Sequence, residues 1–206
     1  MFVKLFIIGI TGGTGAGKTA ALRSLKSLGA LTLNCDAIYH KLLSDNSELK
    51  DELEARFTGV LCSGEINRKL LGEIVFSDPS ALLELNTITH KYVTEEIGRR
   101  ISDWAAKGGK IAAIDAIALI ESGIAEKCDV VVGVIAPPET RISRIMRRDK
   151  ITREQAEMRI NAQKPNSFFE ENCDCILDSN SRWTAESEEK IKDFFIKLLH
   201  ERCVSL

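Results

Sequence analysis

Residues 12–19 read GGTGAGKT, and this glycine-rich stretch decides the fold. It fits the pattern G-x-x-x-x-G-K-[ST] at every position. An apolar run that ends in Thr11 precedes it, and apolar residues at helical spacing, from Ala21 to Leu28, follow it. The order is therefore strand, phosphate-binding loop and helix.

The loop is predicted to bind the phosphates of a nucleotide, because glycines allow successive backbone N–H groups to converge on one anion. The following helix adds the positive end of its dipole. Lys18 would reach the β- and γ-phosphates, and Thr19 would place its hydroxyl on a magnesium ion. The predicted ATP-binding residues of the loop are Gly12, Gly13, Thr14, Gly15, Ala16, Gly17, Lys18 and Thr19.

Composition limits the function classes. A chain of 206 residues with 44% hydrophobic residues can bury one core with insertions. A net charge of −2 provides no general attraction to nucleic acid or to a membrane surface, so any nucleotide chemistry must depend on local charge. The apolar run Leu5–Ile10 is too short to span a bilayer and leads into the loop without a signal-peptide cleavage site, so a cytoplasmic protein is expected. The six cysteines form no C-x-x-C pair and are expected as reduced thiols.

Further apolar stretches predict the other strands of a parallel sheet at residues 30–34, 110–116, 129–136 and 172–178. The carboxyl ends of such strands gather at one edge of the sheet, where ligands bind. Asp36 follows the first of these strands and is a candidate catalytic residue. Asp36 could also be the N-cap of a helix that starts near Ala37, and the two roles are compatible. Asp115 ends its apolar strand in the manner of a Walker B aspartate, which holds a magnesium-bound water.

Residues 37–109 show helical patterns without a convincing central strand. A helical insertion between two strands is typical of small-molecule kinases, where it holds the acceptor. Arg68, Asn86 and His90 are its candidate functional residues. A single histidine on a long helix is more often a packed or solvated residue than a ligand.

Residues 139–170 are rich in arginine and include a capping box formed by Thr152 and Gln155. Charge runs are commonly solvated helix faces, but after the fourth strand of a phosphate-loop protein this one favours a lid over the triphosphate. The basic residues from Glu139 to Gln163 are Arg141, Arg144, Arg147, Arg148, Lys150, Arg153 and Arg159.

Together these features resemble the dephospho-coenzyme A kinase family, and the likeness runs through most of the chain. The stretches that carry it are ITGGTGAGKT, LNCDAIYHKL, SGEINRKLLGEIVF, LNTITHKYV, AIDAIALIESGI, RRDKITREQAEMRINAQ and CDCILDSNS. The resemblance implies transfer of the ATP γ-phosphoryl group to the ribose 3′-hydroxyl of dephospho-coenzyme A. It also implies a nucleoside-monophosphate-kinase-like fold with a five-stranded parallel core, a helical acceptor domain and a lid.

The resemblance also implies roles for individual residues. Asp36 matches the family's base for the acceptor hydroxyl, and His90 and Arg148 match positions associated with substrate and nucleotide. The expected catalytic residues are thus Asp36, Lys18 and Arg148, with Arg148 also binding ATP. The expected acceptor-binding residues are Asp36, Arg68, His90 and Glu121, and the expected magnesium ligands are Thr19 and Asp115.

Several positions on the acceptor side differ from the family pattern. Asn34, Cys35 and Asp36 stand where D-A-D is usual, and Lys91 follows His90 in place of proline. Residues 117–119, IAL, replace P-L-L, and LDSNS at 177–181 replaces I-D-N-S-G. A diverged kinase of another nucleoside-bearing molecule therefore stays open as an alternative.

The expected fold is α/β: a P-loop NTPase with a five-stranded parallel sheet flanked by helices. The single kinase domain comprises a core at 1–36, 110–138 and 171–206, an acceptor subdomain at 37–109 and a lid at 139–170. A non-catalytic nucleotide-binding regulator is a second alternative, although the N-K-x-D element of guanine-specific switches is absent from the sequence. ATP and magnesium are the expected cofactors, and the sequence leaves the oligomeric state open.

Overall fold

The computed structural model describes residues 5–180 and 184–204. The chain divides into two compact units. The first, here called the core unit, comprises the chain up to Leu33 and from Asp103 onward, and the second, here called the helical unit, is Asn34–Ser102. The sequence analysis placed the helical insertion at 37–109.

The core unit contains a five-stranded parallel sheet, as predicted, with the strand order β2-β5-β1-β6-β7. The central strand β1 pairs in parallel with β5 and β6, and β6 pairs in parallel with β7. The strands are β1 (Phe6–Thr11), β2 (Leu31–Asn34), β5 (Ile111–Asp115), β6 (Val130–Ile135) and β7 (Cys175–Asp178). Each lies within its predicted range or overlaps it.

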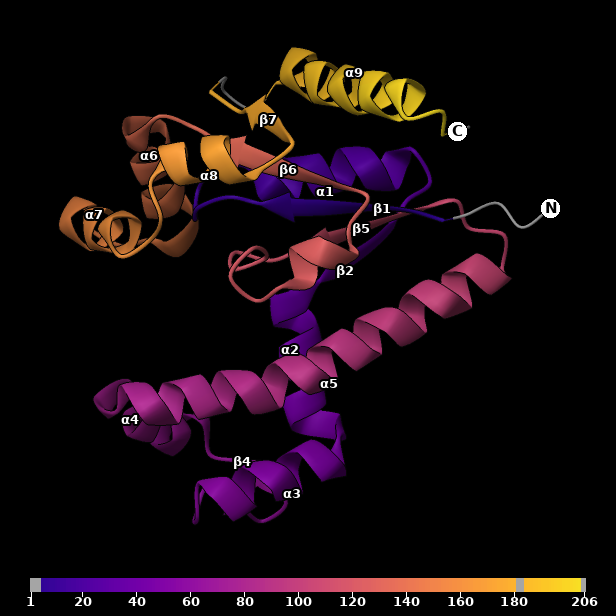
Figure 1. Ribbon diagram of the computed structural model, residues 1–206. Helices are drawn as coiled ribbons and strands as arrows, with labels where there is room; N and C mark the ends of the chain where they lie inside the picture. The colour runs from indigo at the N-terminus through magenta and orange to yellow at the C-terminus, as the bar shows by residue number, and fades with distance from the viewer. Residues whose placement is uncertain (1–4, 181–183, 205–206) are drawn as a thin grey trace. The chain divides into compact units, whose positions relative to one another are not determined.

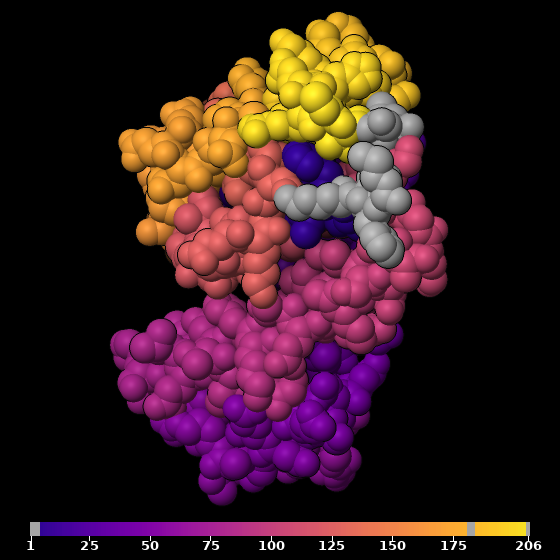
Figure 2. Space-filling view, turned by 45° about the vertical axis from the view of Figure 1, so that its right-hand side comes forward, coloured from indigo at the N-terminus to yellow at the C-terminus, as the bar shows by residue number. Residues whose placement is uncertain are grey.

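Helices α1 (Lys18–Ser27) and α9 (Ala185–Glu201) pack together on one face of this sheet (Figure 1). Leu25 of α1 and Phe195 of α9 are fully buried against Ile8 and Ile10 of β1. Full burial of one such side chain stabilises the fold by about 1.5–3 kcal/mol. Figure 2 shows the yellow C-terminal helix beside indigo residues from the start of the chain, so segments from both ends of the sequence build this layer.

The arginine-rich segment folds into α6 (Pro138–Asp149) and α7 (Arg153–Asn161), followed by α8 (Asn166–Asn172). The predicted capping box of α7 is confirmed, because Thr152 accepts from the backbone of Gln155 and the Gln155 side chain accepts from the backbone of Thr152. A short 3₁₀ helix, η1 (Ile124–Lys127), lies between β5 and β6. No helix among the described residues is both long enough and apolar enough to span a bilayer. All six cysteines are free thiols.

The helical unit consists of α2 (Cys35–Asp45), α3 (Ser47–Arg56), α4 (Arg68–Ser77) and most of α5 (Pro79–Ala106), with a core of its own. Leu49, Leu53 and Leu71 are among its most buried residues. It also contains a small hairpin of β3 (Leu61–Cys62) and β4 (Glu65–Ile66), which the sequence analysis missed. Ser63 and Gly64 form the two-residue turn with positive φ angles of 51° and 81°.

The interpretation of Asp36 as an N-cap is wrong. The helix begins at Cys35, and the N-cap is Asn34, whose side chain accepts a hydrogen bond from the N–H of Ala37 at 2.8 Å. Asp36 lies in the first turn of α2 and is exposed. A carboxylate in a first turn interacts favourably with the helix dipole, but Asp36 is not needed to cap the helix.

Candidate active site

The phosphate loop Gly12–Thr19 connects β1 to α1 and has the backbone that its glycines predict. Gly12, Gly15 and Gly17 have φ angles of 137°, 79° and 115°, which side chains rarely permit. The loop turns back on itself, since the N–H of Ala16 donates to the carbonyl of Gly13 at 3.1 Å. The Lys18 ammonium donates to the carbonyl of Gly12 at 2.6 Å and so lies over the loop.

Several N–H groups of the loop are available to an anion. Within residues 5–180 and 184–204, the N–H groups of Gly15, Gly17 and Thr19 donate no hydrogen bond. They lie at the amino end of α1, where the helix dipole also favours negative charge. This combination of amides, dipole and the Lys18 ammonium suits a phosphate group.

Two arginines of α6 hold the loop from outside. Arg144 donates to the carbonyls of Gly15 and Ala16, both at 3.1 Å, and to the carbonyl of Ser179 at 2.6 Å. Arg141 donates to the carbonyl of Thr14 at 2.9 Å. Burial lowers the pKa of both guanidinium groups, with the charge of Arg147 adding to the effect at Arg144. These two arginines therefore shape the phosphate loop, a role that the sequence analysis did not assign to them.

Arg148 has a different environment. Its exposed guanidinium forms two hydrogen bonds with Asp149, of 2.7 and 3.0 Å, which raise the pKa of Arg148. Asp149 also pairs with Arg159 of α7. Among the described residues, Arg148 has no hydrogen bond to the phosphate loop. The structure thus holds Arg148 in an ion-pair cluster.

Thr19 and Asp115 provide oxygen atoms suited to a magnesium ion. Thr19 is the exposed second residue of α1, and Asp115, only 6% exposed, ends β5 beside Ile10 of β1. Both are hard oxygen donors, and magnesium bound to a nucleotide needs few protein ligands because phosphates and waters supply the rest. The described residues contain no group of three or more His, Cys, Asp or Glu side chains that could enclose a metal. The residues present fit magnesium that arrives with a nucleotide.

Glu121 lies exposed in the turn between β5 and η1, within the core unit. The other expected acceptor residues belong to the helical unit. Arg68 donates to the carbonyl of His40 at 3.3 Å, and α2 carries His40 one turn after Asp36. Burial raises the pKa of the neighbouring Tyr39, against the opposing charge of Arg68.

His90 lies half-buried on α5. Burial lowers the pKa of this imidazole. Its side chain therefore favours the neutral form, which can both donate and accept hydrogen bonds. In the described residues no hydrogen bond links His90 to Asp36 or Arg68.

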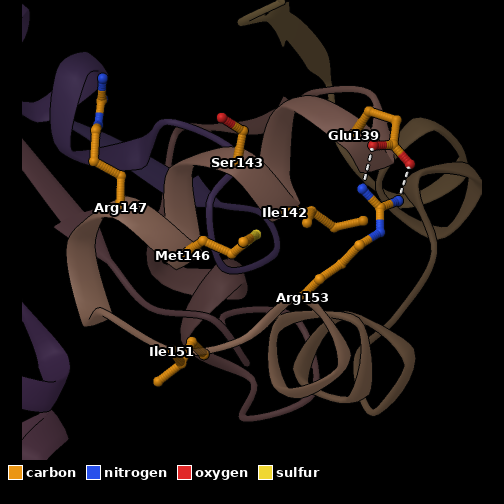
Figure 3. Close-up of a pocket in the computed structure, with 7 residues that line it drawn as sticks. All are labelled: Glu139, Ile142, Ser143, Met146, Arg147, Ile151 and Arg153. Atoms are coloured by element: carbon orange, nitrogen blue, oxygen red, sulfur yellow. Dashed lines mark hydrogen bonds and ion pairs between the residues drawn. The ribbon is translucent and has the colours of Figure 1, made fainter.

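A cavity of about 400 Å³ lies between α6 and α7 (Figure 3). Arg153 closes one side through paired hydrogen bonds to Glu139, while Arg147 points away from the other side chains (Figure 3). The residues that line the cavity are Glu139, Ile142, Ser143, Met146, Arg147, Ile151 and Arg153. None of these residues belongs to the phosphate loop.

Comparison with known proteins connects this geometry to a family. A family model described as dephospho-CoA kinase matches residues 6–185. The chain belongs to the dephospho-CoA kinase family.

Individual relatives agree with this membership. A dephospho-CoA kinase of Dehalococcoides mccartyi is 35% identical over 86% of this chain and 90% of its own. One of Geobacter sulfurreducens is 33% identical over 93% of this chain and 98% of its own. The solved structure of TT1252 from Thermus thermophilus superimposes with a TM-score of 0.79, at 27% identity, over 96% of this chain and 97% of its own.

The position Asn34, which differs from the usual pattern of the dephospho-CoA kinase family, has a structural role, because its side chain caps α2. Asparagine and aspartate cap helices almost equally well, so either residue at this position would keep the cap. The remaining carboxylate of the motif, Asp36, is exposed and is not used as a cap. Ser181, the last residue of the altered LDSNS stretch, lies outside the described residues.

Proposed function

We propose that this protein transfers the γ-phosphoryl group of ATP to the 3′-hydroxyl of dephospho-coenzyme A, which gives coenzyme A and ADP. The observation that carries the proposal is the complete phosphate loop, folded with Lys18 over it and backed by two arginines. The loop occurs in a chain of the family named for this reaction. The relatives from Dehalococcoides mccartyi and Geobacter sulfurreducens carry the same name at 35% and 33% identity.

The nucleotide half of the reaction depends on positioning and charge. The N–H groups of Gly15, Gly17 and Thr19 bind phosphate oxygens, and Lys18 exchanges the Gly12 carbonyl for the β- and γ-phosphates. Phosphoryl transfer needs little covalent help from a protein, so these interactions supply most of the rate. Arg148, released from Asp149, stabilises the charge on the transferred group.

Thr19, through its hydroxyl, and Asp115, through its carboxylate, are the residues that would hold the magnesium ion of the nucleotide. When bound, the metal neutralises charge on the β- and γ-phosphates. Asp115 is buried at the end of a fully buried strand, so its carboxylate keeps a fixed position. Thr19 is fixed by the first turn of α1.

The acceptor half depends on Asp36. Its carboxylate accepts the proton of the 3′-hydroxyl as the bond from that oxygen to the γ-phosphorus forms and the bond from phosphorus to ADP breaks. Arg68 binds the anionic diphosphate of the acceptor, and His90 and Glu121 form hydrogen bonds with it. Asp36 then releases the proton to solvent, for which its exposed position is suited.

The test is to mix the purified protein with ATP, magnesium and an acceptor and to follow ADP release. The acceptor panel contains dephospho-coenzyme A, nucleoside monophosphates and simple sugars. Turnover with dephospho-coenzyme A at least 100-fold above the other acceptors is expected. Turnover with another acceptor instead would reject the named substrate, and no turnover by a folded, ATP-binding protein would reject the kinase activity.

Asp36→Asn tests the base. The change keeps the size of the side chain and removes its basicity, so kcat should fall by about 10²–10⁴ while the affinity for ATP stays within twofold. Asp51→Asn is the matched control, because Asp51 is also an exposed aspartate on a helix of the helical unit. Equal activity of the two variants would remove the assigned role of Asp36.

A further inference from the structure

Gln163 binds Thr14 of the phosphate loop across 149 residues of sequence. Its side-chain oxygen Oε1 accepts from the N–H of Thr14 at 2.8 Å, and its nitrogen Nε2 donates to the Thr14 hydroxyl at 2.8 Å. Only a side-chain amide offers an acceptor and a donor in this arrangement without a charge. The contact is therefore specific to glutamine chemistry.

Arg141 completes the arrangement. It donates through Nε to the carbonyl of Thr14 at 2.9 Å and through Nη2 to Oε1 of Gln163 at 3.0 Å. The N–H, the carbonyl and the hydroxyl of Thr14 are thus all engaged by two side chains. We call this set of interactions of Gln163 and Arg141 the Thr14 clamp.

Among the described residues, the charge of Arg141 has no acidic partner. Arg141 is only 3% exposed, and among residues 5–180 and 184–204 no carboxylate lies within ion-pair distance of its guanidinium group. A buried charge without a counter-charge is costly, unless a ligand supplies one. The clamp therefore places an unneutralised positive charge in hydrogen-bond contact with Thr14 of a loop built for anions.

The clamp also fits the loop closely. A Cβ atom at Gly13 would lie 2.2 Å from Nη2 of Arg141 and 3.1 Å from Oε1 of Gln163, so a side chain there would displace the clamp. Gln163 itself is held at the end of α7, where its N–H donates to the carbonyl of Ile160 at 3.1 Å. Loop, α6 and the end of α7 thus form one hydrogen-bonded assembly.

We propose that Gln163 and Arg141 are positioning residues for nucleotide binding. They fix Thr14, so that the N–H groups of Gly15, Gly17 and Thr19 keep the geometry of a phosphate site, and the bound triphosphate balances the charge of Arg141. This inference rests on the proposed function only in that the ligand is a nucleoside triphosphate. The identity of the acceptor does not enter.

Gln163→Met tests the clamp, because methionine has a similar length and no polar amide. The affinity for magnesium-ATP, measured by titration calorimetry, should fall at least tenfold, since the Thr14 N–H and Arg141 each lose a partner. In the kinase assay, KM for ATP should rise by a similar factor while KM for the acceptor stays within twofold. Unchanged ATP affinity in a folded variant would overturn the proposal.

Gln155→Met is the matched control. Gln155 is an exposed glutamine of α7 whose side chain caps the helix and does not touch the loop. Its loss should lower the unfolding temperature slightly and leave ATP affinity within twofold. An equal loss of ATP affinity in both variants would show that α7 acts through stability alone, and would overturn the proposal.

Gln163→Glu serves where the methionine variant does not fold. The carboxylate keeps acceptors for Thr14 and Arg141 but cancels the buried positive charge. ATP and inorganic tripolyphosphate should both bind at least tenfold more weakly, because the effect is on the phosphates. Undiminished binding of both would contradict the role of the Arg141 charge.

If the unmodified protein binds ATP but does not phosphorylate dephospho-coenzyme A, only the proposed function fails.

Discussion

Gly12→Ala should lower both the stability of the protein and its affinity for nucleotide. The structure separates two causes, backbone strain and steric overlap. Gly12 has a φ angle of 137°, and a Cβ atom there would lie 2.2 Å from the carbonyl oxygen of Val134. That carbonyl cannot easily retreat, because Val134 is fully buried in β6 and pairs with Leu177 of β7. The backbone strain costs about 1–3 kcal/mol. The steric overlap adds about 1–3 kcal/mol.

A matched control isolates the strain from the overlap. Gly29 also has a positive φ angle, 84°, but no atom lies within 4 Å of the position of its Cβ. Gly29→Ala should therefore cost only about 1–2 kcal/mol. The difference between the two variants contains the close approach between the loop and β6, together with any additional backbone strain at the φ angle of Gly12.

Urea unfolding and ATP titration calorimetry measure the two effects. Gly12→Ala should lower the free energy of unfolding by about 2–6 kcal/mol, a large share of the 5–15 kcal/mol of an ordinary domain. Relief of the overlap must shift the loop, so ATP affinity should fall about 100-fold, whereas Gly29→Ala should bind ATP normally. Equal stability of the two variants, or normal ATP affinity of Gly12→Ala, would refute the reasoning.

Two further predictions concern titratable groups. Hydrogen bonds from Arg99 and then Arg100 lower the pKa of Glu96 from 4.5 to about 2, so its stabilisation is complete above pH 4.5 and disappears as the pH falls towards 2. Glu96→Gln should cost about 1 kcal/mol at pH 7 after solvent screening and nothing at pH 2, and a constant difference from pH 7 to 2 in chemical unfolding would contradict the pairing. The exposed thiols of Cys62 and Cys203 should react first with a disulfide reagent, ahead of the four buried or half-buried cysteines. Peptide mass spectrometry identifies the labelled sites, and rapid labelling elsewhere would contradict the burial.

The sequence was sufficient to predict structural features that depend only on residues close together in the chain. The order of strand, loop and helix around Gly12–Thr19 follows from local periodicity and from one motif, and it is confirmed. Local rules also account for the start of α5, where Asp78 accepts from the N–H of Ser80 at 2.8 Å and Pro79 occupies the first turn.

Local rules failed where two residues satisfied the same rule. Asn34 and Asp36 can both cap a helix, and only the point at which β2 ends decides between them. The β3–β4 hairpin was missed because its strands are two residues long, although Ser63-Gly64 is a turn signal.

The Thr14 clamp could not be predicted from the sequence, for a different reason. Nothing in the periodicity of α6 distinguishes Arg141, which is buried against the loop, from Arg148, which is exposed. Gln163 is the last residue of one of the stretches that resemble the family, but the sequence analysis attached no role to it. Contacts over 149 residues depend on the packing of whole elements, and periodicity does not report that packing.

These contacts restrict any closing motion of the arginine-rich segment. Near its start, Arg144 binds the phosphate loop, and near its end Gln163 binds the same loop. Asn166 adds a hydrogen bond of 3.1 Å to the carbonyl of Ala136, just after β6. A motion that keeps these hydrogen bonds is limited to the residues between Arg144 and Gln163. Arg148 and Arg159 both pair with Asp149 in that interval, so they would move together. A triphosphate would then compete with one carboxylate for two guanidinium groups, and its higher charge favours the exchange.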